Sequence, residues 1–247
     1  MEKYKVLILG GSGFVGTKLI ELKPKDISLF ATFNTSVKDA ADVVWERCDL
    51  LDRSKTKKVL EKIKSDIIIN TSKTLPQAVK NIVTYAKQNN TRLIHLSSDA
   101  IFDGRKGNYI EQDQPNPITE YGKGKLIEEE EIEKVLDDYV IIRTSYVYGK
   151  SGGQWDKRTM NLLNSKKVSV YTNMFRSPTL VDDLANEIWK ISQGEYRGIL
   201  HVVGPKMNMY DFFTTLAKNV DVKIEIEKQK CVDNNITFDT SLIRSKY

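Results

Sequence analysis

The sequence is poor in cysteine and histidine. Its 247 residues include two cysteines, Cys48 and Cys231, and two histidines, His95 and His201. The cysteines have neither the spacing of metal ligands nor the density of a disulfide framework, which favours a reducing compartment. So few ligands of this type argue against a zinc centre, and we expect no metal site. Both histidines lie inside apolar runs, where we expect them in or near the core rather than as ligands.

Long apolar runs and tracts of one charge sign are also missing. No apolar run approaches the roughly 20 residues that span a bilayer, and the first run ends at glycines without a signal-peptide cleavage site. The 38 Lys and Arg against 33 Asp and Glu give a net charge of +5 and are scattered along the chain, whereas a nucleic-acid binder gathers its cations into a patch. We therefore expect a cytoplasmic protein that binds a small molecule, with neither a membrane nor a nucleic acid as partner.

What the sequence does contain is a series of apolar runs of strand length, separated by longer amphipathic stretches such as 54–64, which follows a plausible helix cap at Ser54. This pattern is typical of buried parallel strands joined by helices. We therefore predict an α/β fold, with a doubly wound parallel Rossmann-type sheet. The strand-like runs are 4–10, 27–33, 66–72, 92–98, 139–149 and 198–204.

The character of the chain changes after Gly149, where the polar segment "KSGGQWDKR" begins and the later elements become shorter. We place a soft boundary there. It separates a dinucleotide-binding domain, residues 1–150, from a smaller substrate-binding lobe, residues 151–247, and the two can interleave.

The glycines of "LGGSGFVG" lie between the first predicted strand and a helix. Glycine there permits a tight turn, a close approach to a pyrophosphate, and free amides at the positive end of the helix. Glycines also simply make turns, but the strand before and the helix after favour dinucleotide binding. The residues expected to bind the cofactor are Gly10, Gly11, Ser12, Gly13, Phe14, Val15 and Gly16.

The end of the second predicted strand bears on the choice of cofactor. An acidic residue there would favour NAD, but the segment offers Asn34, Thr35, Ser36 and then Lys38, which suit a 2′-phosphate better. We therefore predict NADP, with NAD as the alternative. Further on, Asp49 could accept a hydrogen bond from the adenine amine or, equally well on spacing alone, cap a helix or turn.

Tyr121 and Lys125 stand four residues apart in a segment that soon becomes helical, so they share a face. The ordinary pKa of a tyrosine is about 10, and a nearby ammonium lowers it. A lysine can also hydrogen-bond a cofactor ribose. Such a pair often arises by chance, but a buried strand ending in Ser97 and Ser98 adds a hydroxyl at the sheet edge where ligands bind. We therefore hypothesise that Ser98, Tyr121 and Lys125 are catalytic. The alternatives are a strand-end turn residue for Ser98 and a solvated helix surface for the pair.

Together these segments resemble the extended short-chain dehydrogenase/reductase superfamily, and within it the dTDP-4-dehydrorhamnose reductases. The resemblance implies that NADPH delivers hydride to C4 of a nucleotide-linked 4-keto-6-deoxy sugar, with Tyr121 as proton donor, Lys125 as its partner and Ser98 beside them. It also implies cofactor contacts from Asn70, Thr71 and Ser72, and from Asp49 and Leu50 near the adenine, and it makes a homodimer plausible. The matching segments are "LGGSGFVG", "CDLLD", "DIIINTS", "LIHLSSDAIFDG", "NPITEYGKGKL", "VIIRTSYVYG", "SPTLVDDLA" and "GILHVVG".

The departures from the family fall where the sugar nucleotide should bind. Asp99 is retained, but Ala100 replaces an aromatic residue, Tyr146 stands where tryptophan is usual, and Arg176 is a bulky cation at an altered segment. We expect these four residues to contact the substrate. Because lost polar contacts change discrimination between substrates strongly, the sugar and the nucleotide stay open. The acidic run 128–131 is expected to be a solvated helix face.

Two other functions fit the same motifs. A sugar-nucleotide epimerase or dehydratase would use the same loop and Tyr-x-x-x-Lys pair with a retained NAD. A non-catalytic, NADP-binding regulatory subunit, resembling the beta subunit of methionine adenosyltransferase, would share the fold without turnover.

Overall fold

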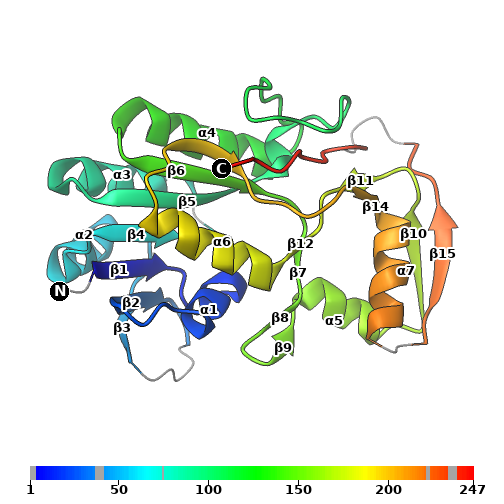
Figure 1. Cartoon of the computed structure of the whole chain (residues 1–247), viewed down its shortest axis with the longest axis horizontal. Coiled ribbons are helices and arrows are strands. Elements are labelled where there is room, and N and C mark those ends of the chain that lie inside the picture. Colours follow the sequence, from blue (N-terminus) through cyan, green and yellow to red (C-terminus); the bar gives the residue numbers. More distant parts are fainter. Residues whose placement is uncertain (1–3, 37–41, 74, 221–222, 233–237) are drawn as a thin grey trace.

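The computed structural model describes residues 4–36, 42–73, 75–220, 223–232 and 238–247. Its centre is a parallel sheet of seven strands in the order β13-β6-β5-β4-β1-β2-β3 (Figure 1). The strand order reverses between β1 and β4, so the crevice at the carboxyl ends of these two strands is the expected ligand site. The predicted doubly wound α/β fold is confirmed. The strands are β1 Tyr4–Leu9, β2 Ile27–Phe33, β3 Val43–Arg47, β4 Ile67–Asn70, β5 Arg92–Ser98, β6 Tyr139–Thr144 and β13 Gly198–His201.

Helices cover both faces of the sheet because successive strand residues point to opposite sides. On β1, Val6 and Ile8 enter a core shared with α1 (Phe14–Glu21) and α6 (Val181–Gln193). Leu7 and Leu9 enter the opposite core, which is covered by α2 (Arg53–Ile63), α3 (Pro76–Asn89) and α4 (Glu120–Val135). The continuous apolar runs seen in the sequence are therefore strands buried on both faces.

A smaller group of elements lies beside the sheet and has its own apolar core around Leu162, Val170, Phe212 and Leu216 (Figure 1). The chain enters this lobe after β6, returns to the main sheet through α6 and β13, and then enters the lobe again. Residues 181–201 therefore pack with the sheet, between two lobe segments. The lobe elements are β7 Val147–Tyr148, β8 Lys150–Ser151, β9 Gln154–Trp155, α5 Lys157–Leu163, β10 Lys167–Tyr171, β11 Phe175–Arg176, β12 Thr179–Leu180, β14 Met207–Asn208, α7 Met209–Asn219 and β15 Glu225–Gln229.

One predicted helix start was wrong by two residues. Asp52, not Ser54, caps α2, and its carboxylate accepts the amide of Lys55 at 3.0 Å. The ionised carboxylate is a stronger acceptor than a serine hydroxyl, and Ser54 donates its own hydroxyl to Asp52 at 2.9 Å. Across the described ranges, no helix combines the length and apolarity needed to cross a bilayer.

Candidate functional site

The glycine loop after β1 has the geometry of an anion cradle. Gly10 has a φ of +81°, and a Cβ on Gly16 would lie 2.3 Å from the Gly10 carbonyl oxygen, so neither position accepts a side chain without a shift. Helix α1 begins at Phe14 with Gly13 as its N-cap and no acidic residue in its first turn. The first-turn amides of a helix lack intrahelical acceptors and carry positive potential. The loop therefore fits a dinucleotide pyrophosphate.

The other predicted loop residues divide into exposed and packed positions. Ser12, Gly13, Phe14 and Val15 reach the surface to different degrees. Gly11 is buried, and a Cβ there would lie 2.6 Å from the Ala31 Cβ of β2. The Gly11 position is therefore restricted by packing on the sheet.

The predicted ribose-binding segment lies at the carboxyl ends of β2 and β3. Asn34 is exposed, and its carbonyl accepts the Nε of Arg47 at 3.2 Å. Lys38, on which the NADP prediction partly rested, lies outside the described residues. Arg47 was not singled out from the sequence, where it is one arginine among many at the end of a short strand. It places a cation at the edge where an adenosine 2′-phosphate would be recognised.

The residues predicted to border the adenine follow β3. Asp49 Oδ1 accepts the Leu51 amide at 3.0 Å, so this aspartate forms a turn. Leu50 is half-buried and packs on the α2 side of the core.

The segment after β4 lies against the glycine loop. A Cβ on Gly10 would approach the Ser72 Cα to 2.9 Å. The amide and hydroxyl of Thr71 both bond to the Leu9 carbonyl, at 3.0 and 3.1 Å, and Asn70 is buried with an exposed fraction of 1%. The structure therefore brings the loop and residues 70–72 together at the reversal of strand order.

Ser98 is the last residue of β5, as predicted. Its hydroxyl lies 3.2 Å from Asp99 Oδ1 and accepts the Ala100 amide, also at 3.2 Å. A short 3-10 turn, η1 (Asp99–Ile101), follows directly.

Helix α4 packs its first turn tightly on η1. Thr119 caps the helix by accepting the Gly122 amide at 3.0 Å. A Cβ on Gly122 would lie only 2.0 Å from the Ala100 carbonyl oxygen, so the two backbones touch at this point. Tyr121 precedes Gly122 and is therefore held close to the Ser98 segment. Gly122 was missed in the sequence analysis, where a glycine following a tyrosine carries no distinct signal.

The predicted pair differs sharply in burial. Tyr121 is 55% exposed, whereas Lys125 is 5% exposed. The Lys125 ammonium lies 3.2 Å from the Leu96 carbonyl of β5 and 2.8 Å from Glu128 Oε2. The lysine is thus fixed to the strand that carries Ser98.

The prediction that the acidic run of α4 is a solvated face was wrong for its first two members. Glu128 and Glu129 have exposed fractions of 1% and 0%. Glu129 pairs with Arg143 of β6 at 2.8 Å and accepts the Ser97 hydroxyl. These carboxylates lie on the face of α4 that packs on β5 and β6, where cationic partners compensate their burial. Glu130 is exposed, as expected.

Two of the residues predicted to contact the substrate, Asp99 and Arg176, interact with other residues of the chain. Asp99 is 8% exposed, and its Oδ2 accepts the hydroxyls of Ser145 at 2.8 Å and Thr240 at 2.7 Å. Arg176 Nε lies 3.8 Å from the same oxygen, and burial lowers the pKa of this guanidinium. Asp99 therefore joins the end of β5 to the lobe and to the carboxyl-terminal segment, and Arg176 brings a cation beside Asp99.

Tyr146 belongs to an aromatic cluster at the junction with the lobe. Its ring centroid lies 5.4 Å from that of Phe212 and 5.7 Å from that of Phe213, and the Arg158 guanidinium lies 4.8 Å from the ring. Burial raises the pKa of the Tyr146 phenol, so the group stays protonated at neutral pH.

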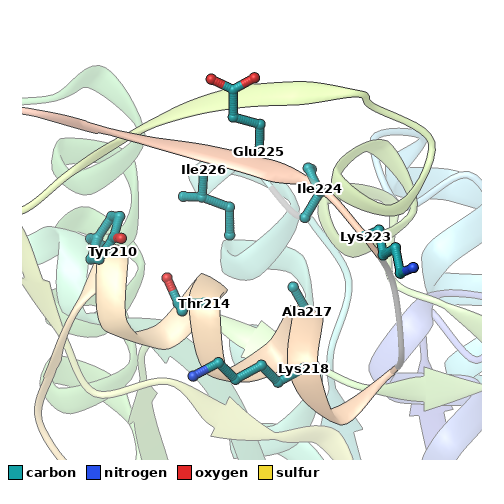
Figure 2. A pocket seen from close by; sticks show the side chains of 8 residues that line it. All are labelled: Tyr210, Thr214, Ala217, Lys218, Lys223, Ile224, Glu225 and Ile226. Carbon is teal, nitrogen blue, oxygen red and sulfur yellow. The ribbon is translucent and has the colours of Figure 1, made fainter.

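A groove of about 530 Å³ lies elsewhere, between α7 and β15 of the lobe (Figure 2). Ile224 and Ile226 point from the strand side towards Ala217 and Thr214 on the helix, and Lys218 and Lys223 lie at its rim. None of the predicted site residues lines this groove. We therefore place the candidate site at the carboxyl edge of the main sheet.

Comparison with known protein families and curated proteins gives consistent results. Residues 73–236 match the family described as RmlD substrate binding domain. A dTDP-4-dehydrorhamnose reductase of Sinorhizobium fredii is 33% identical over 121 residues, covering 45% of this chain and 41% of that enzyme. The reductase of the same name from Aggregatibacter actinomycetemcomitans is 25% identical over 260 residues, covering 95% of this chain and 85% of the relative. Methionine adenosyltransferase 2 subunit beta of Danio rerio is 28% identical over 162 residues, covering 59% and 49%.

Solved structures share the whole fold. A dTDP-4-dehydrorhamnose reductase from Bacillus anthracis in complex with NADP gives a TM-score of 0.81 at 22% identity, covering 98% of this chain and 91% of that chain. The Bordetella bronchiseptica enzyme WbmH in complex with NAD+ gives a TM-score of 0.80 at 19% identity, covering 98% and 89%. At these identities the similarity establishes a common architecture.

Proposed function

Because this chain belongs to the family of the RmlD substrate binding domain and is therefore an NAD(P)-dependent oxidoreductase, we propose that it reduces a nucleotide-linked 4-keto-6-deoxy sugar with NADPH. The observation that carries the proposal is the contact of the first turn of α4 with η1, because it joins the Tyr121 helix to the Ser98 strand end. The glycine loop lies at the same edge of the sheet, two strands away. Reductase chemistry needs these parts together.

Each catalytic group has a distinct task. Bound NADPH would supply the hydride for C4 of the sugar. Tyr121, half-exposed at the start of α4, donates its phenolic proton to the C4 oxygen, and the ammonium of Lys125 stabilises the resulting phenolate. The Ser98 hydroxyl rotates from Asp99 to donate a hydrogen bond to the same oxygen.

The substrate class is supported by the names of the relatives and by two cations that lie beside Asp99 and Tyr146. Arg176 lies beside Asp99, and Arg158 lies against Tyr146. A guanidinium recognises phosphate oxygens well, so these two residues suit the diphosphate of a nucleoside diphosphate sugar. Arg47, at the end of β3, favours NADPH over NADH for the same reason.

The test is NADPH oxidation with a dTDP-4-keto-6-deoxy sugar, comparing Tyr121→Phe with Tyr4→Phe. Tyr4 is 63% exposed at the start of β1, the opposite edge of the sheet, and serves as the matched control. We expect Tyr121→Phe to lose at least about 100-fold in turnover with nearly intact NADPH affinity, and Tyr4→Phe to keep both. Full turnover by Tyr121→Phe would remove Tyr121 from the mechanism.

A regulatory role is the second candidate, favoured by the match to methionine adenosyltransferase 2 subunit beta and by the internal engagement of Asp99. It predicts NADPH binding, capture of a partner protein, and no turnover on any sugar nucleotide. An epimerase or dehydratase would instead keep NAD bound through purification.

A further inference from the structure

A line of buried polar side chains connects the ammonium of Lys125 with the predicted cofactor groove. Lys125 Nζ lies 2.8 Å from Glu128 Oε2, the same oxygen lies 3.1 Å from His95 Nε2, and His95 Nδ1 lies 3.2 Å from Asn70 Nδ2. The four residues have exposed fractions of 5%, 1%, 0% and 1%. The line ends at Ser72, whose amide donates to Asn70 Oδ1 at 3.2 Å.

The protonation states of His95 and Glu128 orient all hydrogen bonds of this line towards Glu128. Burial lowers the pKa of His95, so its imidazole is neutral at pH 7. Burial raises the pKa of Glu128, but the hydrogen bond from His95 and the charge of Lys125 outweigh this and hold the pKa below its usual range. The neutral His95 therefore donates its Nε2 proton to the carboxylate and accepts the Asn70 amide at Nδ1. Every donor in the line points towards the ionised Glu128.

The contacts of Lys125 leave one hydrogen-bond donor of its ammonium for a ligand. An ammonium has three donors, of which one goes to Glu128 and one to the Leu96 carbonyl at 3.2 Å. The two protein acceptors fix the ammonium between β5 and Glu128, and one donor stays available for a cofactor hydroxyl.

We propose that Glu128 is a positioning residue, which holds the Lys125 ammonium in place for the cofactor and offsets part of its charge at Tyr121. This inference rests on the proposed reductase function. It assigns a role to Glu128 and to its orienting partner His95.

The charges around Glu128 make its effect on Tyr121 specific. On α4, Lys125 is its direct partner, whereas Glu129 is compensated by Arg143 from β6 at 2.8 Å. His95 from β5 is neutral, and α3 contributes apolar side chains and Tyr85 to this core. Glu128 is thus the counter-ion of the ammonium that acts on Tyr121.

The size of the effect follows from helix geometry. Tyr121 and Glu128 are seven residues apart on α4, which corresponds to about 10 Å. At an effective dielectric constant of roughly 20 to 40, a charge at this distance changes a titration by about 0.5 to 1 pH unit. Without the carboxylate, the ammonium of Lys125 is uncompensated, so the rate should fall off at a lower pH on the alkaline side.

The experiment compares Glu128→Gln with Glu129→Gln, its buried neighbour on the same helix. NADPH affinity is measured by fluorescence titration without any sugar, and the pH profile of the reduction is measured separately. We expect Glu128→Gln to weaken NADPH binding about tenfold, as for loss of a charged hydrogen bond, and to move the alkaline limb down by about 0.5 to 1 pH unit. Glu129→Gln should lower thermal stability and leave NADPH affinity unchanged.

Several outcomes would overturn the proposal. These are a folded Glu128→Gln protein with unchanged affinity and profile, or an equal loss of NADPH affinity in Glu129→Gln. If Glu128→Gln does not fold, His95→Gln tests the same hydrogen-bonded line by changing the partner of Glu128 instead. It should weaken NADPH binding without moving the alkaline limb, because Glu128 keeps its charge, and unchanged affinity would contradict the role of the line.

Failure of the proposed function is distinguishable from failure of this inference. NADPH affinity requires no sugar substrate, so a protein that reduces no sugar nucleotide still reports on Glu128 through the binding measurement. Absence of NADPH binding by the unmutated protein would overturn both.

Discussion

The contact between Gly122 and Ala100 gives the sharpest test of how the fold builds the site. A Cβ on Gly122 would lie 2.0 Å from the Ala100 carbonyl oxygen, and real Cβ contacts essentially never fall below 3.0 Å. In Gly122→Ala, the first turn of α4 must therefore move from η1 by at least about 1 Å. Because the atom it meets belongs to the backbone, no side-chain rotation relieves the clash.

The cost divides between stability and activity. Overpacking of this kind costs about 1 to 3 kcal/mol, offset by the gain of about 1 kcal/mol when alanine replaces glycine in a helix. A displacement of about 1 Å between catalytic groups can lower the rate about 100-fold. We therefore expect the kcat/KM of Gly122→Ala to fall about 100-fold, with a modest decrease in Tm.

Gly124 is the matched control, since it lies on the same helix and a Cβ there meets nothing within 4 Å. Gly124→Ala should keep its kcat/KM within about twofold and raise Tm slightly, by the same helix propensity. The measurements are NADPH oxidation with the sugar nucleotide and a thermal melt for each variant. Wild-type turnover in Gly122→Ala would refute the idea that this contact places Tyr121 beside Ser98.

Two further predictions concern the cofactor edge and the buried histidines. Arg47→Ala should weaken NADPH binding about tenfold and leave NADH binding unchanged, as measured by fluorescence titration. Arg197→Ala, an exposed arginine at the opposite sheet edge, should change neither, and an equal loss for both nucleotides would contradict 2′-phosphate recognition. Burial lowers the pKa of His95 and of His201, so below pH of about 6.5 the unfolded chain binds protons that the folded protein does not. The free energy of unfolding should therefore fall as pH drops from about 7.5 to 5.5, by up to about 1.4 kcal/mol for each histidine, and equal denaturant midpoints at these two pH values would contradict it.

The periodic parts of the fold could be read from the sequence. Strands buried on both faces give unbroken apolar runs, and β1, β2, β4, β5, β6 and β13 all fall within the predicted ranges. The glycine loop could be predicted equally well, because the positive φ of Gly10 and the close backbone approach at Gly16 leave little choice of residue. The lobe was poorly predicted, since most of its short strands pair with partners distant in the sequence.

Predictions from local sequence also failed where the environment of a side chain depends on a residue distant in the sequence. Glu128 and Glu129 look like a solvated run because the sequence does not show that His95 and Arg143 lie opposite them. Asp52 took the capping position from Ser54 because a carboxylate accepts amides more strongly than a hydroxyl does.

By itself, the sequence determined the doubly wound sheet, the glycine loop and the identities of Ser98, Tyr121 and Lys125 as candidates, because periodicity and glycine spacing are local properties. Only the tertiary structure decided how these candidates meet. It placed α4 on η1 through Gly122, bound Glu128 to His95, and turned Asp99 towards Ser145 and Thr240. Each of these contacts joins segments that the chain brings together only when it folds, so no local pattern in the sequence encodes it.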